Sequence, residues 1–173
     1  MIKFLNILLS SVEEQKEIRE WRNDLEVRKY MYNTEIITEE EHLKWLDSLK
    51  TRKDTDVFYV LYEGKKIGIA SVNQLDLKNK ICEWGLYFNN NIERGKGIGK
   101  LVEKEFIKYM FDNYDIDKIN CGVLSNNLKV VEMHKKFGWT LEGILRKNIL
   151  INGERLDIYL LGLLREEWSK KYE

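Results

Sequence analysis

The chain has 173 residues, of which 43% are hydrophobic and 34% are charged. A chain of this size buries roughly two-thirds of the surface that it exposes when unfolded, so it can fold without a disulfide framework or a structural metal. Lys and Arg total 29 and Asp and Glu total 29, so no overall field attracts nucleic acid or an anionic membrane. We therefore expect one domain over residues 1–173, with no nucleic acid and no membrane as partner.

The N-terminal apolar run is short. It stops at Ser10, too early for a membrane span, and no cleavage region of a signal peptide follows it. The two cysteines, Cys82 and Cys121, lack a CxxC partner and a histidine at ligand spacing. We therefore predict a cytoplasmic protein with inert buried thiols and no metal site.

The first part of the chain predicts one strand and two helices. Residues 3–9 are predicted as the strand, and residues from about 12–22 and 39–49 as the helices. Thr38 is placed to cap the second helix, and Glu41, three positions on, completes a capping box. Both helices should therefore precede the first hairpin of the chain.

Three successive strands predict an antiparallel meander. Residues 57–62 are rich in β-branched and aromatic side chains, Gly64 turns the chain into residues 66–75, and a further turn leads into residues 80–88. In the last strand, the period of two sets an apolar face against a face with functional groups. The apolar face holds Cys82, Trp84, Leu86 and Phe88, and the other face holds Ile81, Glu83, Gly85 and Tyr87.

The second half of the chain alternates helices with strands. Apolar residues recur at helical spacing from Ile98 to Met110, so a long amphipathic helix follows a glycine-rich turn. A buried strand over 119–124, a helix over 127–137 and a hairpin folded at Asn152-Gly153 come next. This order of two helices, a meander, βαβ and a hairpin places the fold in the α/β (α+β) class.

The glycine-rich turn has the features of a phosphate-binding site. It joins a strand to a helix, so its amides are the unpaired donors of a helix N-terminus. Its glycines let a phosphate approach the main chain, and Arg94 and Lys96 add positive charge. It differs from a P-loop because no Ser or Thr follows the lysine. A basic, flexible turn is the alternative interpretation.

The same turn resembles the R/Q-x-x-G-x-G/A signature of GNAT acetyltransferases, which Arg94, Gly97 and Gly99 match. A second motif of that superfamily is similar to Asn126 and to the HKKFGW segment that begins at His134. The resemblance implies the GNAT fold, a mixed and mostly antiparallel twisted sheet flanked by helices, with acetyl-CoA as cosubstrate and no metal. The residues that it implies for acetyl-CoA binding are Leu86, Tyr87, Arg94, Gly95, Lys96, Gly97, Ile98, Gly99 and Asn126.

The N-terminal half narrows the resemblance to one subgroup. The segments WRND, KYMYN, EEHLKWLDSL and CEWGLYF look like those of PseH, the UDP-4-amino-4,6-dideoxy-N-acetyl-β-L-altrosamine N-acetyltransferases of pseudaminic acid biosynthesis. This implies acetyl transfer in a ternary complex to the 4-amino group of a UDP-linked sugar, with Arg22, His42 and Tyr87 on the acceptor side. Cations suit phosphates and aromatic rings suit sugar faces, although core packing explains Trp45 equally well and a surface position explains His42. A homodimer is left open.

Three side chains are candidates for the chemistry. An amine attacks a thioester only as its free base, and the resemblance implies that the Glu83 carboxylate accepts the amine proton directly or through water. It also implies that a backbone amide near Leu86 donates to the thioester oxygen. His134 stands where the family usually has a tyrosine that protonates the CoA thiolate, and Tyr87 is the alternative donor. A solvent-facing Glu83 and a buried structural His134 are the competing interpretations.

Two other functions stay open. Ribosomal-protein or peptide N-terminal acetyltransferases and polyamine acetyltransferases share the fold, and a non-catalytic module could bind acetyl-CoA alone. A polyamine site needs a concentrated acidic pocket, whereas residues 39–41 are acidic because they begin a helix. A binding-only module should lack a candidate base and acid, and this chain has both. We therefore expect a small-molecule nucleotide-sugar acceptor.

Overall fold

The computed structural model describes residues 1–90, 92 and 95–172, and in it one sheet of seven strands runs through the molecule in the order β1-β2-β3-β4-β5-β7-β6. Only the β4–β5 pair is parallel, and the other neighbouring pairs are antiparallel. The sheet is thus mixed and mostly antiparallel, as predicted. The strands are β1 (Ile2–Asn6), β2 (Asp56–Tyr62), β3 (Lys65–Asp76), β4 (Ile81–Phe88), β5 (Lys118–Leu124), β6 (Thr140–Ile151) and β7 (Glu154–Leu164).

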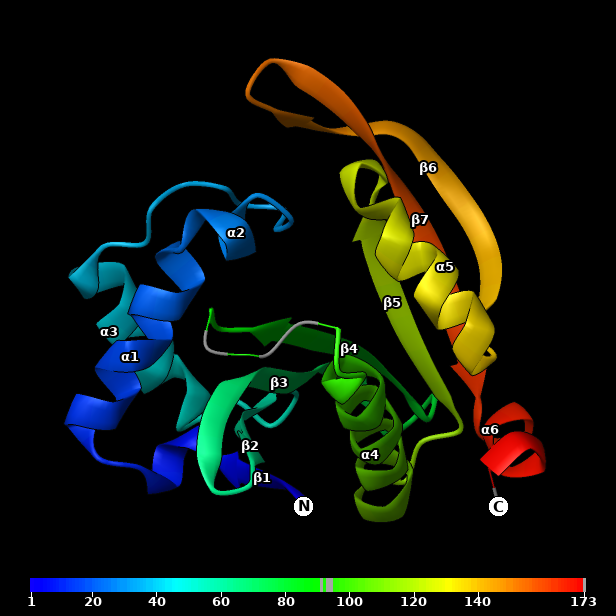
Figure 1. Cartoon of the computed structure of the whole chain (residues 1–173), viewed down its shortest axis with the longest axis horizontal. Helices are drawn as coiled ribbons and strands as arrows, with labels where there is room; N and C mark the ends of the chain where they lie inside the picture. The colour runs from blue at the N-terminus through cyan, green and yellow to red at the C-terminus, as the bar shows by residue number, and fades with distance from the viewer. Residues whose placement is uncertain (91, 93–94, 173) are drawn as a thin grey trace.

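Helices cover both faces of the sheet (Figure 1). They are α1 (Val12–Asn23), α2 (Leu25–Arg28), α3 (Glu39–Leu49), α4 (Ile98–Asn113), α5 (Leu128–Phe137) and α6 (Arg165–Tyr172). The predicted capping box of α3 is present, because the Glu41 amide donates to the Thr38 hydroxyl oxygen at 3.2 Å and the Thr38 amide donates to the Glu41 carboxylate at 2.7 Å. No helix within the described residues is long and apolar enough to cross a bilayer.

Three elements differ from the sequence expectations. The first strand ends at Asn6, whose side chain accepts a hydrogen bond from the Leu8 amide at 2.9 Å and thereby starts a 3-10 turn. The short helix α2 follows α1 after a break at Asp24, which caps it through the Glu26 amide. Helix α6 was not predicted, and it is held by its fully packed Trp168. Each difference therefore arises from a cap or a tertiary contact.

The two faces of β4 pack as the period of two predicts. Trp84 and the other apolar-face residues join the large core under α4, which includes Phe106. Tyr87 points to the opposite side, against a smaller core built from α1, α3 and the middle of the sheet. The final hairpin turns at Asn152 and Gly153, whose φ angles of 50° and 82° are those of the expected left-handed turn. Strand β4 therefore separates two different environments.

Candidate active site

Strands β4 and β5 diverge after a short stretch of pairing (Figure 1). Residues of both strands line a groove. Their parallel register runs only from Ile81↔Lys118 to Glu83↔Asn120. The groove beyond this point has a volume of about 910 Å³ and continues toward the N-terminus of α4. A second cavity of about 370 Å³ adjoins it under α1 and α3. The residues that line both are Arg22, Ile69, Ser71, Asn73 and Tyr87.

The open edge of β4 presents backbone donors to the groove. The Asn89 amide donates to the Ile67 carbonyl at 2.9 Å, so Asn89 points its N–H toward β3. Because N–H groups alternate between the two edges of a strand, the Leu86 N–H points the other way, toward β5. With β5 splayed away at this level, this amide is placed to donate to a ligand in the groove.

The glycine-rich turn lies at the other end of the groove. Gly95 and Gly97 have φ angles of 85° and 75°, and a Cβ on either residue would project into open space. Gly97 is also the N-cap of α4 and supplies no side chain to bond the first helical amides. Groove, bare turn and helix N-terminus together fit a pyrophosphate with an extended tail. Lys96 is exposed within the turn and is not in the described lining of the groove, whereas Arg94 lies outside the described residues.

Asn126 does not lie in the groove lining, although its neighbour Asn127 does. The Asn126 amide instead donates to the Lys29 carbonyl at 2.9 Å, and so ties the start of α5 to the loop after α2. The side chain thus has a structural partner in the absence of ligand. Its role in acetyl-CoA binding stays a prediction.

Glu83 occupies the last position at which β4 pairs with β5. Its half-buried carboxylate accepts a hydrogen bond from Gln74 at 3.0 Å, and the side chain lines neither cavity. Tyr32 reaches the same region, because a Cβ on Gly122 of β5 would collide with the Tyr32 hydroxyl. Burial first, and then the charges of Cys121 and Glu83, raise the pKa of Tyr32. A carboxylate and a phenol therefore lie near the closed end of the groove, where the pairing of β4 with β5 stops.

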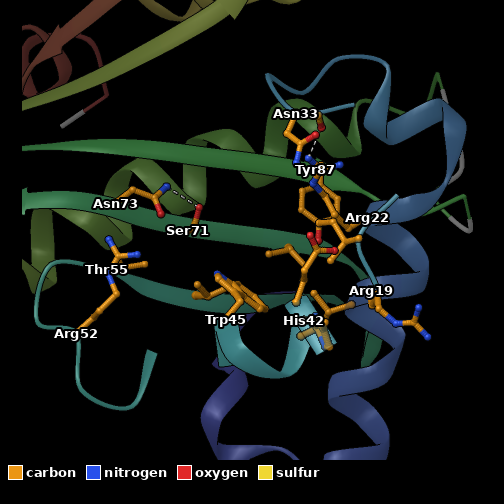
Figure 2. Close-up of a pocket in the computed structure, with 15 residues that line it drawn as sticks. Arg19, Arg22, Asn33, His42, Trp45, Arg52, Thr55, Ser71, Asn73 and Tyr87 are labelled. Carbon is orange, nitrogen blue, oxygen red and sulfur yellow. Dashed lines mark hydrogen bonds between the residues drawn. The ribbon is translucent and has the colours of Figure 1, made fainter. Parts of the chain in front are cut away.

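The cavity under α1 and α3 brings together the three predicted acceptor residues, Arg22, His42 and Tyr87. Arg22 donates to the Asn33 carbonyl at 2.8 Å, while its buried Nη1 has no hydrogen-bond partner among the described residues. Burial lowers the pKa of Arg22 and raises that of Tyr87. Figure 2 shows Arg22, Asn33 and Tyr87 together at one end of the cavity and Arg52 at the other. The unpaired guanidinium nitrogen is the strongest sign of an anion site in the described residues.

His42 has a structural role in addition to its place in the cavity wall. Its side chain is 5% exposed, and Nε2 donates to the Gln15 carbonyl at 2.9 Å. Burial lowers the pKa of His42, which favours the neutral ring. This hydrogen bond joins α3 to α1. Because the side chain is buried, His42 is not a surface histidine, which was the alternative interpretation of the sequence.

The charge of this cavity is mainly positive. Among its described lining residues, Arg19, Arg22 and Arg52 are basic, and Glu41 is the one acidic side chain. Glu41 is already bonded to the Thr38 backbone and hydroxyl, and these bonds lower the pKa of its carboxyl. Arg52 forms an ion pair with Asp54 at 2.8 Å. The cavity as a whole suits an anionic ligand better than a polycation.

His134 lines the groove from α5, but its side chain is only 3% exposed. Its Nδ1 donates to Glu103 at 2.7 Å, and its Nε2 lies 3.9 Å from the Cys121 sulfur. Trp84 and Trp139 pack against the imidazole ring. A place in the site and a buried structural role were the sequence-based alternatives for His134. In the structure His134 lines the groove, and its ring is also buried and hydrogen-bonded.

Glu103 is the residue of this region that sequence reasoning missed. It lies on α4 with 0% exposure, between the apolar residues Val102 and Phe106. A charged residue within the apolar stripe of an amphipathic helix was the available signal, because buried carboxylates need partners.

The described residues contain no group of three or more side chains that could hold a metal ion.

The comparisons with known proteins agree with this architecture. A family model described as an acetyltransferase (GNAT) domain matches residues 9–160. The acetyltransferase PseH of Campylobacter jejuni serotype O:23/36 is 30% identical over 141 residues, which cover 82% of this chain and 86% of that protein.

Two solved structures have the same fold. The structure of Campylobacter jejuni PseH with acetyl coenzyme A has a TM-score of 0.71 at 24% identity, covering 95% of this chain and 99% of that one. The structure of a Vibrio cholerae spermidine N-acetyltransferase with CoA and spermine has a TM-score of 0.88 at 17% identity, covering 97% and 98%. Because both sequence identities are below 25%, the similarity to these two structures shows a shared fold and nothing more.

Proposed function

The chain belongs to the GNAT family of acetyltransferases, and from this premise we propose that it moves an acetyl group from acetyl-CoA to the 4-amino group of a UDP-linked amino-dideoxy sugar. GNAT acetyltransferases use acetyl-CoA, which supplies an activated thioester. The observation that carries the acceptor class is the positively charged cavity beside the groove, with the unpaired buried Nη1 of Arg22. A nucleotide diphosphate offers the acceptor oxygens that such a nitrogen needs.

The groove residues divide the work of binding. The bare amides around Gly97 and the N-terminus of α4 hold the pyrophosphate, with Lys96 adding charge. The Leu86 amide on the unpaired edge of β4 donates to the thioester oxygen and stabilises the charge that develops there. Both contributions come from the backbone, so they depend on the splay of β4 from β5.

Two side chains handle protons in this proposal. Glu83, at the closed end of the groove, accepts the proton of the attacking amine, through water if the carboxylate keeps its bond to Gln74. His134, in the opposite wall of the groove, gives a proton to the departing sulfur. Tyr87, buried against Arg22, then serves the acceptor side, since burial keeps its phenol protonated.

A polyamine acceptor is the alternative within the family, because a spermidine N-acetyltransferase is among the structures with the same fold. A polyamine carries several positive charges and needs carboxylates around it. Among the described residues, the cavity lining instead has three arginines, of which Arg52 is paired with Asp54, and one glutamate, which is bonded to Thr38. This charge balance favours the anionic sugar nucleotide, as does the 30% identity to a PseH.

A parallel assay of CoA release tests the proposal. UDP-linked 4-amino sugar, spermidine and a peptide with a free N-terminus are compared at equal concentration, with calorimetry of CoA binding as the control. We expect a kcat/KM for the sugar nucleotide at least about 100-fold above the others, the scale of losing a charge-assisted contact. Preference for spermidine or the peptide contradicts the acceptor assignment. CoA binding without any acetyl transfer favours a binding module.

A further inference from the structure

Glu103 and His134 form a buried pair behind the groove. Both side chains are almost fully enclosed, with exposures of 0% and 3%, and Nδ1 of His134 donates to Oε1 of Glu103 at 2.7 Å. Trp139 donates its indole N–H to the same oxygen at 3.1 Å, whereas Oε2 has no hydrogen-bond partner within the described part of the chain. The carboxylate thus uses one oxygen to accept two hydrogen bonds, and one of these comes from a group that can carry positive charge.

His134 is the side chain bonded to this carboxyl group that can carry a positive charge. A buried carboxylate without a cation costs several kcal/mol by usual estimates, and Trp139 can offer only a neutral donor. The other titratable groups facing the pair are Cys121 from β5 and Tyr172 from α6, and neither is cationic. The exposed Lys104 has its amine over the Tyr172 ring, 5.2 Å from the centroid. The pair is therefore most stable as a carboxylate with an imidazolium.

The electrostatics of the ring agree with this geometry. Burial lowers the pKa of His134, but the hydrogen bonds and charges of Cys121 and Glu103 outweigh burial and raise that pKa to about 9. An ordinary histidine, with a pKa near 6.5, is mostly neutral at pH 7.5. Here the ring keeps its second proton at neutral pH, where a proton donor is needed.

The hydrogen bond to Glu103 also orients the His134 ring. Nδ1 is occupied by Glu103, which lies behind the wall, so the second N–H of the imidazolium is on Nε2. Nε2 lies 3.9 Å from the Cys121 sulfur, and both His134 and Cys121 line the groove. The hydrogen bond from Nδ1 to Glu103 thus leaves Nε2 on the side of Cys121, a residue of the groove lining.

We propose that Glu103 is a positioning residue that keeps His134 charged and turns its Nε2–H toward the groove for donation to the CoA sulfur. This inference rests on the proposed function. As the carbon–sulfur bond breaks, the sulfur keeps the electron pair and takes the proton of Nε2. The imidazole becomes neutral, and solvent restores its proton before the next turnover. Glu103 itself touches neither substrate.

Histidine NMR tests the charge state without turnover. The chain has two histidines, His42 and His134, so ¹H–¹⁵N spectra across pH 5 to about 10 resolve both rings, and a His42→Gln variant assigns them. We expect His134 to be doubly protonated at pH 7.5, and Glu103→Gln to lower its titration midpoint by about 1 to 3 units, the usual effect of an adjacent charge. A neutral His134 at pH 7 in the wild-type chain overturns the proposal, even if the variant does not fold.

The matched control is Glu132→Gln on the same helix as His134. Glu132 is exposed and paired with Lys135 at 2.9 Å, so the substitution removes the same charge without touching the buried pair. In kinetics, we expect the alkaline fall of kcat to move to lower pH in Glu103→Gln and to stay in place in the control, with the KM for acetyl-CoA unchanged in both. Unmoved pH profiles in Glu103→Gln contradict the positioning role.

Thermal denaturation gives a further readout. The folded-state pKa of His134 lies above its unfolded value, so its contribution to stability is complete below about pH 6.5 and is lost as pH rises through about 9. We expect this alkaline loss to be smaller in Glu103→Gln than in Glu132→Gln, and equal losses contradict the proposal. Absence of acetyl transfer with every amine would reject the proposed function and would leave both the NMR and the denaturation tests valid.

Discussion

Replacing Gly97 with valine should weaken CoA binding without unfolding the protein. Gly97 has a φ of 75°, where a β-branched residue costs roughly 1 to 3 kcal/mol, less than the total stability of a typical domain, about 5 to 15 kcal/mol. Among the described residues other than its chain neighbours, no atom lies within 4 Å of the place that its Cβ would take. The added methyl groups instead occupy the space through which a phosphate approaches the amides of α4.

The expected loss follows from the contacts removed. Each charge-assisted hydrogen bond contributes about 1.5 to 3 kcal/mol, so losing one contact raises the Kd for CoA by about tenfold to somewhat over a hundredfold. Calorimetry with CoA measures this change, and circular dichroism checks the fold. The matched control is Gly64→Val, since Gly64 has a φ of 81° with open space around its Cβ and lies in the β2–β3 turn.

Comparison of the two variants separates strain from binding. Both carry the same backbone penalty, so both should lose similar stability, but only Gly97→Val should lose affinity for CoA. An unchanged Kd in Gly97→Val, or an equal loss in Gly64→Val, refutes the assignment of the turn as the pyrophosphate site.

Two further substitutions test the acceptor side and the base. Arg22→Ala should raise the KM for the amine acceptor and leave that for acetyl-CoA unchanged, because Arg22 is one of the three arginines in the described lining of the cavity. The reverse pattern in steady-state kinetics shows that the acceptor site is elsewhere. Glu83→Gln should lower kcat/KM by at least about 100-fold near neutral pH and by less at high pH, where more amine is already neutral, with CoA binding intact. Near-full activity of this variant from about pH 6 to 9 assigns the proton to water or substrate instead.

Local patterns were sufficient for much of the fold. The period of two in residues 81–88 correctly separated Trp84 from Tyr87, and a capping box correctly placed the start of α3 at Thr38. These features depend on neighbours within a few residues, which is why spacing alone reveals them. The family followed from similar short-range motifs. Helix α6 was missed because its place depends on tertiary contacts, such as the burial of Trp168.

The electrostatics of the candidate site depended on contacts between distant segments. Glu103 and His134 are 31 residues apart in the chain. The helical spacing within α4 and within α5 does not predict that the two helices bring these residues together. The partner of Arg22, the carbonyl of Asn33, lies 11 residues away and leaves one nitrogen unpaired.

The sequence by itself determined most of the elements, the glycine-rich turn and the family, because hydrophobic periods and turn residues act locally. Only the tertiary structure decided that β4 and β5 part after Glu83, that His42 is buried, and that His134 is hydrogen-bonded to the buried Glu103. Hydrogen bonds and ionic contacts form between side chains that tertiary packing places within about 3 to 4 Å of each other. The spacing of residues along the chain does not predict these distances.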